Sequence, residues 1–431
     1  MRALALLMIV VAAFLAVRWL APASDPLQAG AKVETEVAEG ARFLPPPARG
    51  VEEPRPKARA ETPGVSADEP AAPQASKPAR FLPSSGSLAD ELEAARALAH
   101  GSPADVQAAA AALPPERALL LEAFAWAVAG ERQMAHSLAA RLEKEGVAGR
   151  ERALLEAALQ GQGAIPAGAG APTASELAME MALLAREGQT LLAARDFPAA
   201  ARAFSALLVA ELDAPFAPDA AALARWTEGL EQAQREHRWN PRGPWAGAEV
   251  TVESGDSLIS IRKRYLATRP EARLCTGLIE RSNRLSGLLQ PGQKLRIPSD
   301  AVRVLVDLEA RWALYFLGDE VAAAWPVGIG RSGEATPPGD YTAIEKTEKP
   351  TWMKVGQEPI PFGDPRNPLG TRWIGWAREG SKTTYGFHGT REPESIGKAA
   401  SDGCVRFHNE DVEELFQILP EGTPILVRGP G

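Results

Sequence analysis

Two residues near the C-terminus could form a thiol nucleophile and its base. They lie in a stretch that reads Tyr385-Gly-Phe-His388-Gly389-Thr390, then ten residues, then Ser401-Asp402-Gly403-Cys404-Val405-Arg406. A cysteine attacks a carbonyl carbon as the thiolate, so it needs a nearby base that takes its proton. Sixteen residues separate His388 from Cys404, which suits two neighbouring strands joined by a loop. The sequence therefore predicts cysteine-based acyl chemistry at this place.

Glycines and one arginine surround this pair. Gly386 and Gly389 flank the histidine, and Gly403 precedes the cysteine. Because these positions carry no side chains, backbone N–H groups can approach a reacting carbonyl oxygen as an oxyanion hole. Arg406 lies two residues beyond the cysteine and shares a face with it if the strand continues. A guanidinium at that position suits a substrate carboxylate.

The segment 300–429 must position these residues, and its pattern is that of β-strands. Three short apolar stretches end at turn residues, namely Val302–Leu308, Ala313–Leu317 and Val321–Val327. Few helical stretches appear before Asn409–Leu419. We therefore predict a mainly-β domain with a short helix after the cysteine motif. Most of its tryptophans suit a core, and Trp373 or Trp376 is a candidate to line a substrate cleft.

The motifs of this segment resemble those of the L,D-transpeptidases. The matching residues are His388-Gly-Thr, Ser401-Asp-Gly-Cys404-Val-Arg406 and Asn409-Glu-Asp411, with supporting turns at Pro326–Gly330, Ala335–Tyr341 and Asn367–Thr371. The resemblance spans Val302–Arg428 and implies the catalytic domain of that family. It further implies that Cys404 attacks the carbonyl between the third and fourth residues of a peptidoglycan stem peptide and releases D-Ala. An amine of a second stem would then resolve the thioester into a 3-3 crosslink.

The resemblance also implies roles for individual residues. His388 would act as the base, oriented by a backbone carbonyl near Gly389. Gly403 and Cys404 would donate N–H groups to the oxyanion. Contacts with the stem peptide would come from Ser401, Thr390, Tyr385 and Arg406. No metal or cofactor is expected for this chemistry.

Asp402 departs from the family pattern, in which this position is often His or another basic residue. A carboxylate that points at a thiolate raises the pKa of the thiol, because like charges repel. We expect Asp402 to face solvent or Arg406 instead, since turn positions commonly carry solvent-facing Asp. The alternative is an enzyme that is slower or more dependent on pH than its relatives.

Three other functions compete with the transpeptidase. An L,D-carboxypeptidase would use the same residues with water as the acceptor. A non-catalytic protein would keep the fold as a wall-binding scaffold. A zinc site would have to use His388, Cys404, His408 and Asp411 as ligands. It is disfavoured, because this set contains a single thiol and no two ligands at a spacing known from zinc sites.

The segment 246–299 predicts a small βααβ unit. A short alternating strand ends at the turn Gly255-Asp256, Ser257 can cap a helix, a second helix ends near Asn283, and Pro291-Gly292 feeds a second strand. This pattern resembles the LysM family, which implies binding of a glycan with N-acetylglucosamine, here the peptidoglycan strand. By that resemblance the groove would be formed by Gly255, Asp256, Ser257 and Asn283. Cys275 lies between the helices without a motif, and we interpret it as a small buried residue rather than a disulfide partner of Cys404.

The segment 87–240 is rich in Ala, Leu, Glu and Arg and has helical spacing, as at Leu119, Leu120, Ala123, Phe124 and Ala127. The stretch from Ala185 to Phe204 resembles one tetratricopeptide repeat. Stacked repeats need about three copies for stability. Two interpretations therefore stay open: a plain helical spacer, or a TPR-like region that binds a protein partner.

The N-terminal 86 residues predict export and a tether. Residues 1–23 hold a basic residue, an apolar run from Ala3 to Val17 and a small-residue site, which is typical of a signal anchor or a signal peptide. Residues 24–86 are rich in proline and predict a disordered linker. We expect the protein in the cell envelope on the periplasmic side, anchored in the inner membrane, or secreted if the signal is cleaved.

The charge of the chain is mild and uneven. The formal net charge of −8 argues against nucleic acid as a partner. Residues 245–299 carry 9 Lys and Arg against 5 Asp and Glu, whereas residues 300–431 carry 14 against 20. The expected partners are thus peptidoglycan glycan strands, their stem peptides and, through the N-terminal segment, a membrane.

Overall fold

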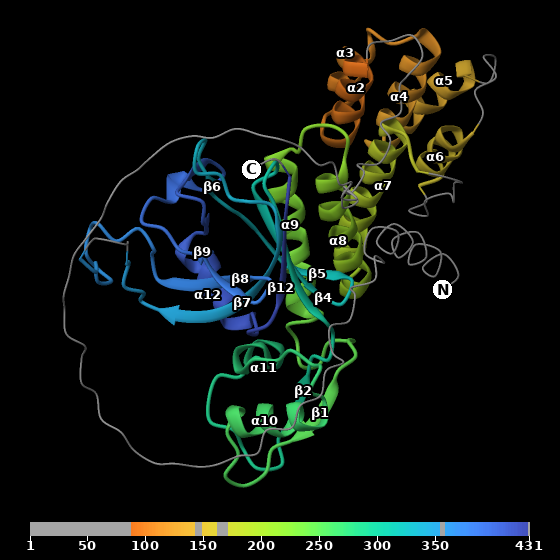
Figure 1. The fold of residues 1–431 in the computed structure, drawn as a ribbon. Coiled ribbons are helices and arrows are strands. Elements are labelled where there is room, and N and C mark those ends of the chain that lie inside the picture. The colour runs from red at the N-terminus through yellow and green to blue at the C-terminus, as the bar shows by residue number, and fades with distance from the viewer. Residues whose placement is uncertain (1–87, 143–148, 162–170, 354–357, 430–431) are drawn as a thin grey trace, which may run out of the picture. The chain divides into compact units, whose positions relative to one another are not determined.

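The computed structural model describes residues 88–142, 149–161, 171–353 and 358–429 (Figure 1). These residues belong to one unit of the fold. The predicted export segment 1–23 and the predicted linker 24–86 lie outside the described residues. Among the helices that are described, none combines the length and the apolar character needed to cross a bilayer.

Eight helices make up the described part of residues 87–240, and the predicted helical region is confirmed. They are α2 (Leu88–His100), α3 (Pro103–Ala110), α4 (Pro115–Val128), α5 (Arg132–Leu142), α6 (Arg150–Leu159), α7 (Ala174–Ala193), α8 (Phe197–Asp213) and α9 (Ala220–Glu236). Polar side chains that cap the N-terminus explain where several of these helices begin. The Thr173 hydroxyl accepts the N–H of Glu176, whose carboxylate accepts the N–H of Thr173. Asp196 and Asp219 cap α8 and α9.

The next segment has the strand–helix–helix–strand order that the sequence predicts. Its elements are β1 (Ala248–Thr251), α10 (Leu258–Thr268), α11 (Thr276–Asn283) and β2 (Lys294–Ile297). The two strands pair antiparallel, with Val250 opposite Leu295. Ser257 starts α10, because its hydroxyl accepts the N–H of Ser260 at 3.1 Å.

One sheet organises the remaining residues, and the predicted mainly-β domain is confirmed. Its strands are β3 (Val302–Asp307), β4 (Trp312–Leu317), β5 (Glu320–Pro326), β7 (Gly339–Glu348), β8 (Arg372–Arg378), β9 (Ser381–His388), β11 (Val405–Arg406) and β12 (Pro424–Arg428). They pair in the order β11-β9-β8-β7-β12-β3-β4-β5. Outside this sheet, β6 (Ile329–Gly330) pairs parallel with β10 (Ala399–Ser401), and η1 spans Pro393–Ser395. The predicted helix after the cysteine is α12 (Asn409–Ile418).

Strands β3, β4 and β5 are buried on both faces. On β4, Leu314 and Phe316 join the hydrophobic core of the helical region. Ala313 and Tyr315, at the alternate positions, belong to the core of the sheet domain. A sheet that is covered on both sides needs apolar residues at consecutive positions. This burial explains why these strands appear in the sequence as continuous apolar runs.

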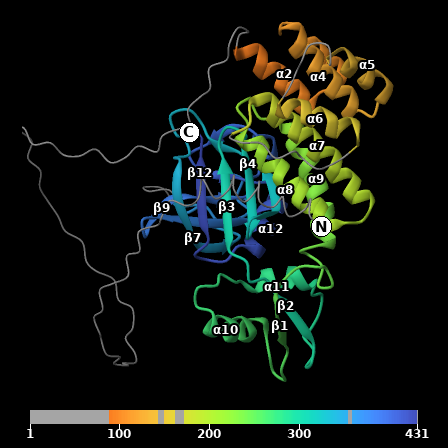
Figure 2. The ribbon, with the colours of Figure 1, turned by 90° about the vertical axis from the view of Figure 1, so that its right-hand side faces the viewer.

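The helical region also covers the open edge of β5. The N–H of Val321 donates to the Ser205 hydroxyl of α8, and Nε2 of Gln234 on α9 donates to the Val321 carbonyl, each at 2.8 Å. Figures 1 and 2 show α8 and α9 running beside this edge. An uncovered edge strand is a template for aggregation. The region is thus part of the fold around the sheet, which corrects the interpretation as a plain spacer.

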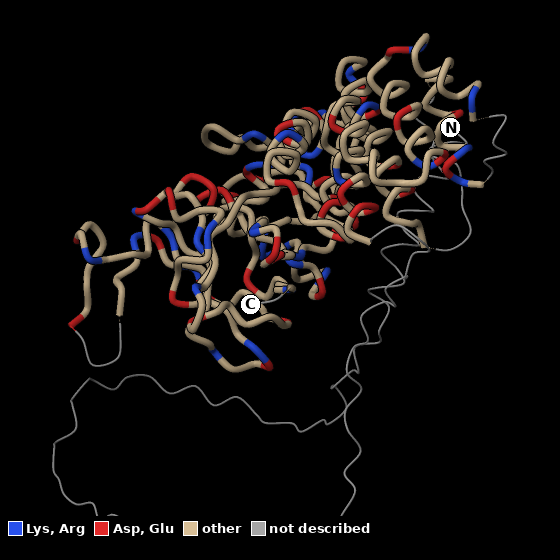
Figure 3. The backbone as a smooth tube through the Cα atoms, turned by 90° about the horizontal axis from the view of Figure 1, so that it is seen from above, with Lys and Arg blue, Asp and Glu red and all other residues tan. Residues whose placement is uncertain are grey.

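The βααβ segment contacts the sheet domain through α11 and α12. A Cβ on Gly277 would lie 2.2 Å from the carbonyl oxygen of Gln417, so the two helices approach closely at this glycine. Arg281 of α11 pairs with Glu414 of α12. Residues of both charge signs are interspersed along the described chain (Figure 3), which allows such pairs between segments.

Candidate active site

Two parallel strands bring Cys404 beside the strand that ends in His388. β11 pairs with β9 in a register that places Arg406 opposite His388. Cys404 directly precedes β11 and therefore lies next to Gly386 of β9. Its sulfur is 3.6 Å from the carbonyl oxygen of Thr384 on the same strand. The predicted placement of the two residues on neighbouring strands is confirmed.

The imidazole of His388 is buried and held in one orientation. Its Nδ1–H donates to the carbonyl oxygen of Gly389 at 2.6 Å. This bond leaves Nε2 free to accept a proton. Burial lowers the pKa of His388 to about 4; the hydrogen bond to Gly389 opposes this shift, and the charge of Arg406 adds to it. The ring is therefore neutral at pH 7, as a general base must be.

The thiol of Cys404 is protonated at neutral pH. Burial raises its pKa to about 11, and a backbone hydrogen bond from Gly386 and the charge of Arg406 act against this rise. A neutral thiol beside a neutral imidazole reacts when the proton leaves sulfur for Nε2 while the sulfur–carbon bond forms. The arrangement can thus perform general-base-assisted acyl transfer without a resting thiolate–imidazolium pair.

Alkylation of Cys404 is expected to accelerate with pH through the neutral range. With a thiol pKa of about 11, the thiolate fraction at pH 7 is ~10⁻⁴ and rises about tenfold per pH unit. Iodoacetamide labelling of a Cys275→Ala background, followed by mass spectrometry, measures this rate. A rate that levels off near pH 7 would contradict the assignment, because it would reveal a thiolate already formed in the free protein.

Proteins of one family share this domain. A family model of the L,D-transpeptidase catalytic domain matches residues 301–427. YqjB of Bacillus subtilis, assigned by name to the L,D-transpeptidases, is 38% identical over 132 residues, which cover 30% of this chain and 73% of that protein. The chain belongs to the L,D-transpeptidase family. YkuD of Bacillus licheniformis, assigned in the same way, is 32% identical over 183 residues, covering 41% of this chain and 96% of that protein. The NMR structure of the catalytic domain from the E. faecium L,D-transpeptidase is 24% identical, covers 30% of this chain and 98% of that chain, and superposes with a TM-score of 0.25.

Asp402 of this transpeptidase domain forms an ion pair with Arg331 and not with a residue of the nucleophile's own strand. Its carboxylate is 53% exposed and pairs with Arg331, which also pairs with Glu334 at 2.8 Å. The expected exposure is present, but the cation is Arg331 rather than Arg406. The charge of Asp402 raises the pKa of Cys404 less than burial does. The departure from the family pattern therefore has a small electrostatic effect.

Two predicted binding residues and one predicted oxyanion donor are hydrogen-bonded within the loops of the site. The N–H of Gly403 donates to the Ser401 hydroxyl at 3.2 Å, and that hydroxyl donates to the Cys404 carbonyl at 2.6 Å. Ser401 and Thr390 are buried, and the Thr390 hydroxyl accepts the N–H of Glu392 at 3.0 Å. Both hydroxyls thus have a structural role, and their contact with substrate stays a prediction. The Gly403 N–H, predicted as an oxyanion donor, is engaged within its own turn.

Arg406 and Tyr385 lie at the site as predicted. The Arg406 side chain is 12% exposed and pairs with Glu392 at 3.1 Å. Its buried Nε atom has no hydrogen-bond partner among the described residues, so donor capacity is left for a ligand. The half-buried Tyr385 ring lies against the turn of the nucleophile, because a Cβ on Gly403 would be 2.8 Å from its Cε1 atom.

Asn409 is a residue of the site to which the sequence assigned no role. Its side-chain oxygen accepts the N–H of Thr371 at 3.1 Å, and its Nδ2 donates to the Thr390 carbonyl at 2.9 Å. A Cβ on Gly389 or on Gly370 would lie 2.2 or 2.3 Å from that oxygen. The amide thus joins the loop after His388 to the loop before β8. Its place in the short motif that follows the cysteine is the signal that could have found it.

Replacing Asn409 with alanine is expected to loosen both loops. Two hydrogen bonds are lost and their backbone partners are left unpaired, which costs about 2–4 kcal/mol of unfolding free energy. Urea unfolding of the full chain measures this cost. The matched control is Gln417→Ala at the far end of α12, whose side-chain amide makes a long contact of 3.5 Å to Glu280. Equal stability of the two variants would contradict the role of Asn409.

The four candidate zinc ligands are not brought together. Within the residues that the structure describes, no three His, Cys, Asp or Glu side chains converge in a way that could hold a metal ion. The disfavoured set of His388, Cys404, His408 and Asp411 is therefore not assembled there. His408 instead immediately precedes α12.

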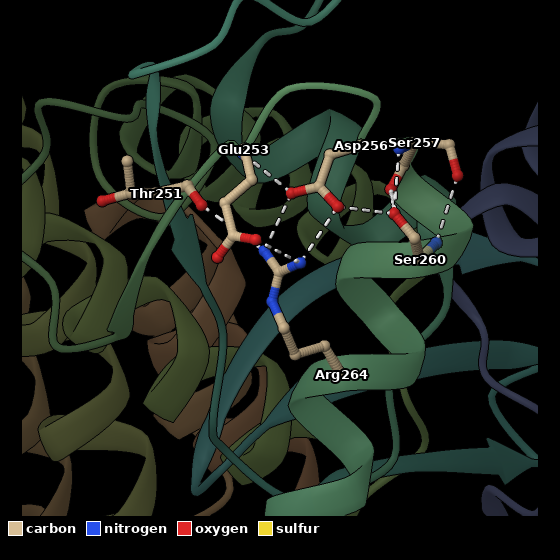
Figure 4. Close-up of polar contacts among 6 residues, drawn as sticks. All are labelled: Thr251, Glu253, Asp256, Ser257, Ser260 and Arg264. Carbon is tan, nitrogen blue, oxygen red and sulfur yellow. Dashed lines mark hydrogen bonds and ion pairs between the residues drawn. The ribbon is translucent and has the colours of Figure 1, made fainter.

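The predicted glycan residues build the turn of the βααβ segment (Figure 4). Both carboxylate oxygens of Asp256 accept from Arg264, at 2.8 and 3.0 Å, and one also accepts from the Ser260 hydroxyl. These bonds to Arg264 lower the pKa of Asp256. Ser257 caps the helix, and Gly255 has a φ of 86°, which favours glycine. The exposed turn is held firmly by its own polar groups.

Asn283 does not face solvent. Its Nδ2 donates to the carbonyls of Ile279 and Arg296, and its side-chain oxygen accepts the N–H of Arg296 at 2.8 Å. The side chain is buried and joins α11 to β2. The side chain thus has a structural role, and its contact with glycan stays a prediction.

Cys275 is a free, half-buried cysteine, as is Cys404. Its sulfur is 3.2 Å from the Gln417 carbonyl oxygen, and burial raises the pKa of its thiol. The position is half-buried rather than fully buried as predicted, and neither cysteine is in a disulfide in this structure.

Proposed function

We propose that this chain is a peptidoglycan L,D-transpeptidase that works through a cysteine thioester. The observation that carries the proposal is the imidazole of His388, whose Nδ1–H is engaged with Gly389 and whose Nε2 is free on the strand beside Cys404. As the sulfur attacks the stem-peptide carbonyl, its proton passes to Nε2. The carbon–nitrogen bond to D-Ala then breaks, and the protonated imidazole returns the proton to the leaving nitrogen.

The second half of the reaction uses the same groups in reverse. An amine of a second stem peptide attacks the thioester carbonyl, and Nε2 of His388 takes its proton. The carbon–sulfur bond breaks, and that proton returns to the sulfur of Cys404. The product is a 3-3 crosslink, and the free thiol is restored. The hydrogen bond from Nδ1–H to Gly389 supports this cycle, because it leaves Nε2 as the ring nitrogen that can accept and return the proton.

Arg406 is proposed to hold a carboxylate of the stem peptide. Its side chain lies opposite His388 in the strand register, and its charge opposes the rise that burial causes in the pKa of Cys404. The unpartnered Nε atom supports this role. A carboxylate bound there would be close to the carbonyl that Cys404 attacks.

The proposal is tested by incubating the full chain with disaccharide tetrapeptides and analysing the products by mass spectrometry. Crosslinked dimers that lack one D-Ala are expected. Free tripeptide alone would indicate an L,D-carboxypeptidase, with water as the acceptor. Unchanged substrate, together with binding to sacculi, would reject the enzymatic function in favour of a wall-binding protein.

We further propose that residues 246–299 are a LysM module that binds the glycan strand. The support is the βααβ order, the rigid turn at Asp256 and two exposed apolar side chains on the segment, Ile259 at 71% and Leu288 at 91% exposure. Apolar side chains beside polar groups suit the faces of a sugar ring. Sedimentation with purified sacculi tests this binding, and an Ile259→Asp, Leu288→Asp double variant that still co-sediments would reject the surface.

The place of the protein is proposed from the N-terminal sequence. The segment 1–23 supports export to the periplasmic side of the cell envelope, with the inner membrane as the anchor or with release after cleavage. A protein partner for the helical region is the remaining alternative role besides its packing on the sheet. Fractionation of cells that express the full chain tests the location, and recovery in the cytoplasm would reject it.

A further inference from the structure

The indole of Trp373 lies against the ring of His388. The two residues are opposite each other in the antiparallel pair of β8 and β9. Their ring centroids are 6.2 Å apart, and their planes differ by 27°. The hydrogen bond from Nδ1 to Gly389 fixes one point of the imidazole. A flat partner on its face limits rotation about the remaining torsion.

The indole is itself held by a charged pair on the neighbouring strands. Its Nε1–H donates to Oε1 of Glu345 on β7 at 3.0 Å. The other carboxylate oxygen pairs with the Lys382 ammonium on β9 at 2.7 Å. The Lys382 contact, followed by the Trp373 bond, lowers the pKa of Glu345. The carboxylate is thus ionised, which is the state in which both of its oxygens accept.

Two glycines make room for this arrangement. Gly375 of β8 and Gly386 of β9 are opposite each other in the sheet. A Cβ on Gly375 would lie 2.7 Å from Oε1 of Glu345, and a Cβ on Gly386 would lie 2.7 Å from Cη2 of Trp373. The carboxylate and the indole therefore lie across positions that have no side chains. In the strand register Gly386 is also the residue opposite Cys404, so the indole lies over the position next to the cysteine.

We propose that Trp373 is a positioning residue that keeps Nε2 of His388 directed at Cys404, and that Glu345 and Lys382 hold its indole in place. This role rests on the transpeptidase reaction proposed above. The indole takes no proton and forms no bond with substrate. It acts by restricting the imidazole, so its effect belongs to the proton-transfer step rather than to binding.

Trp373→Leu is expected to lower kcat for D-Ala release by about 10–100-fold, within the range that general-base catalysis supplies, and to change KM by less than about threefold. Trp373→Phe keeps a flat ring and is expected to restore kcat to within about fivefold of the wild type. Glu345→Ala is expected to fall between the two, because the indole remains but loses its acceptor. Glu348→Gln is the matched control, since Glu348 lies on the same strand and is 66% exposed beside Arg372.

A second measurement in the free protein does not depend on turnover. The Nδ1–H of His388 is expected to exchange with solvent at least about tenfold faster in Trp373→Leu than in the wild type, as seen by NMR of ¹⁵N-histidine-labelled full chain. If the wild type makes no product, the proposed transpeptidase reaction is rejected. The exchange rate of the His388 Nδ1–H still tests whether Trp373 positions the imidazole. Unchanged exchange overturns the inference. The inference is also overturned if Trp373→Phe and Trp373→Leu lose the same factor in kcat and the same amount of stability, because that result indicates a packing defect.

Discussion

Replacing Cys404 with alanine is expected to abolish both release of D-Ala and crosslink formation. In the proposed reaction the sulfur is the atom that forms the acyl bond, and Cys404 directly precedes β11 beside Gly386 of β9. Loss of a nucleophile that works with a base typically lowers kcat by about 10⁴-fold or more. The measurement is product analysis by mass spectrometry with disaccharide tetrapeptides. His388→Gln is expected to lose activity by a similar factor, because the two residues act as one unit.

Cys275→Ala is the matched control for this experiment. That cysteine is the other free thiol of the described chain, and it contacts the Gln417 carbonyl where α11 meets α12. Its removal is expected to leave product formation within about twofold of the wild type. Residual crosslinking by Cys404→Ala, or an equal loss in both variants, would contradict the assignment of the nucleophile.

Removing the helical region is expected to unfold or aggregate the catalytic domain. A fragment of residues 245–431 exposes the outer face of β3, β4 and β5, which is buried in the core of the helices at Leu305, Trp312, Leu314, Phe316, Val321 and Ala324. Burial of each large side chain contributes about 1.5–3 kcal/mol. Their sum is on the order of 10 kcal/mol, which equals the whole stability of a typical domain. The edge bonds of Val321 to Ser205 and Gln234 are lost as well.

A fragment of residues 88–431 is the control for this deletion. It keeps every contact between the helices and the sheet that the structure describes. Circular dichroism melting and size-exclusion chromatography are expected to show a cooperative, monodisperse protein for this fragment and insoluble or aggregated material for residues 245–431. A soluble shorter fragment with an unchanged Tm would show that the helices are dispensable and would contradict the shared core.

Much of the candidate active site was predictable from the sequence, because its chemistry depends on residue types and on short spacings between them. A thiol, an imidazole, flanking glycines and an arginine were sufficient to predict two neighbouring strands, and β9 and β11 are those strands. The βααβ segment was predictable for the same reason, since its caps and turns are local. Local hydrogen bonds depend on residues only a few positions apart.

The contacts of individual polar side chains were not predictable in this way. Ser401, Thr390 and Asn283 have the residue types of ligand-binding groups, yet each is buried and bonded within the protein. A sequence shows which atoms can donate or accept a hydrogen bond, and only the fold shows which groups lie close enough to be their partners. Asp402 makes the same point, because its cation is 71 positions away at Arg331.

The sequence by itself determined the family, the candidate nucleophile and base, and the order of elements, because these depend on residue identity and on spacing within one or two elements. The tertiary structure decided what surrounds them. It placed Trp373 on the face of His388, Asn409 between two loops and the helices on the outer face of the sheet. Each of these contacts joins residues that are distant along the chain, and apolar periodicity predicts that a face is buried without indicating which partner covers it.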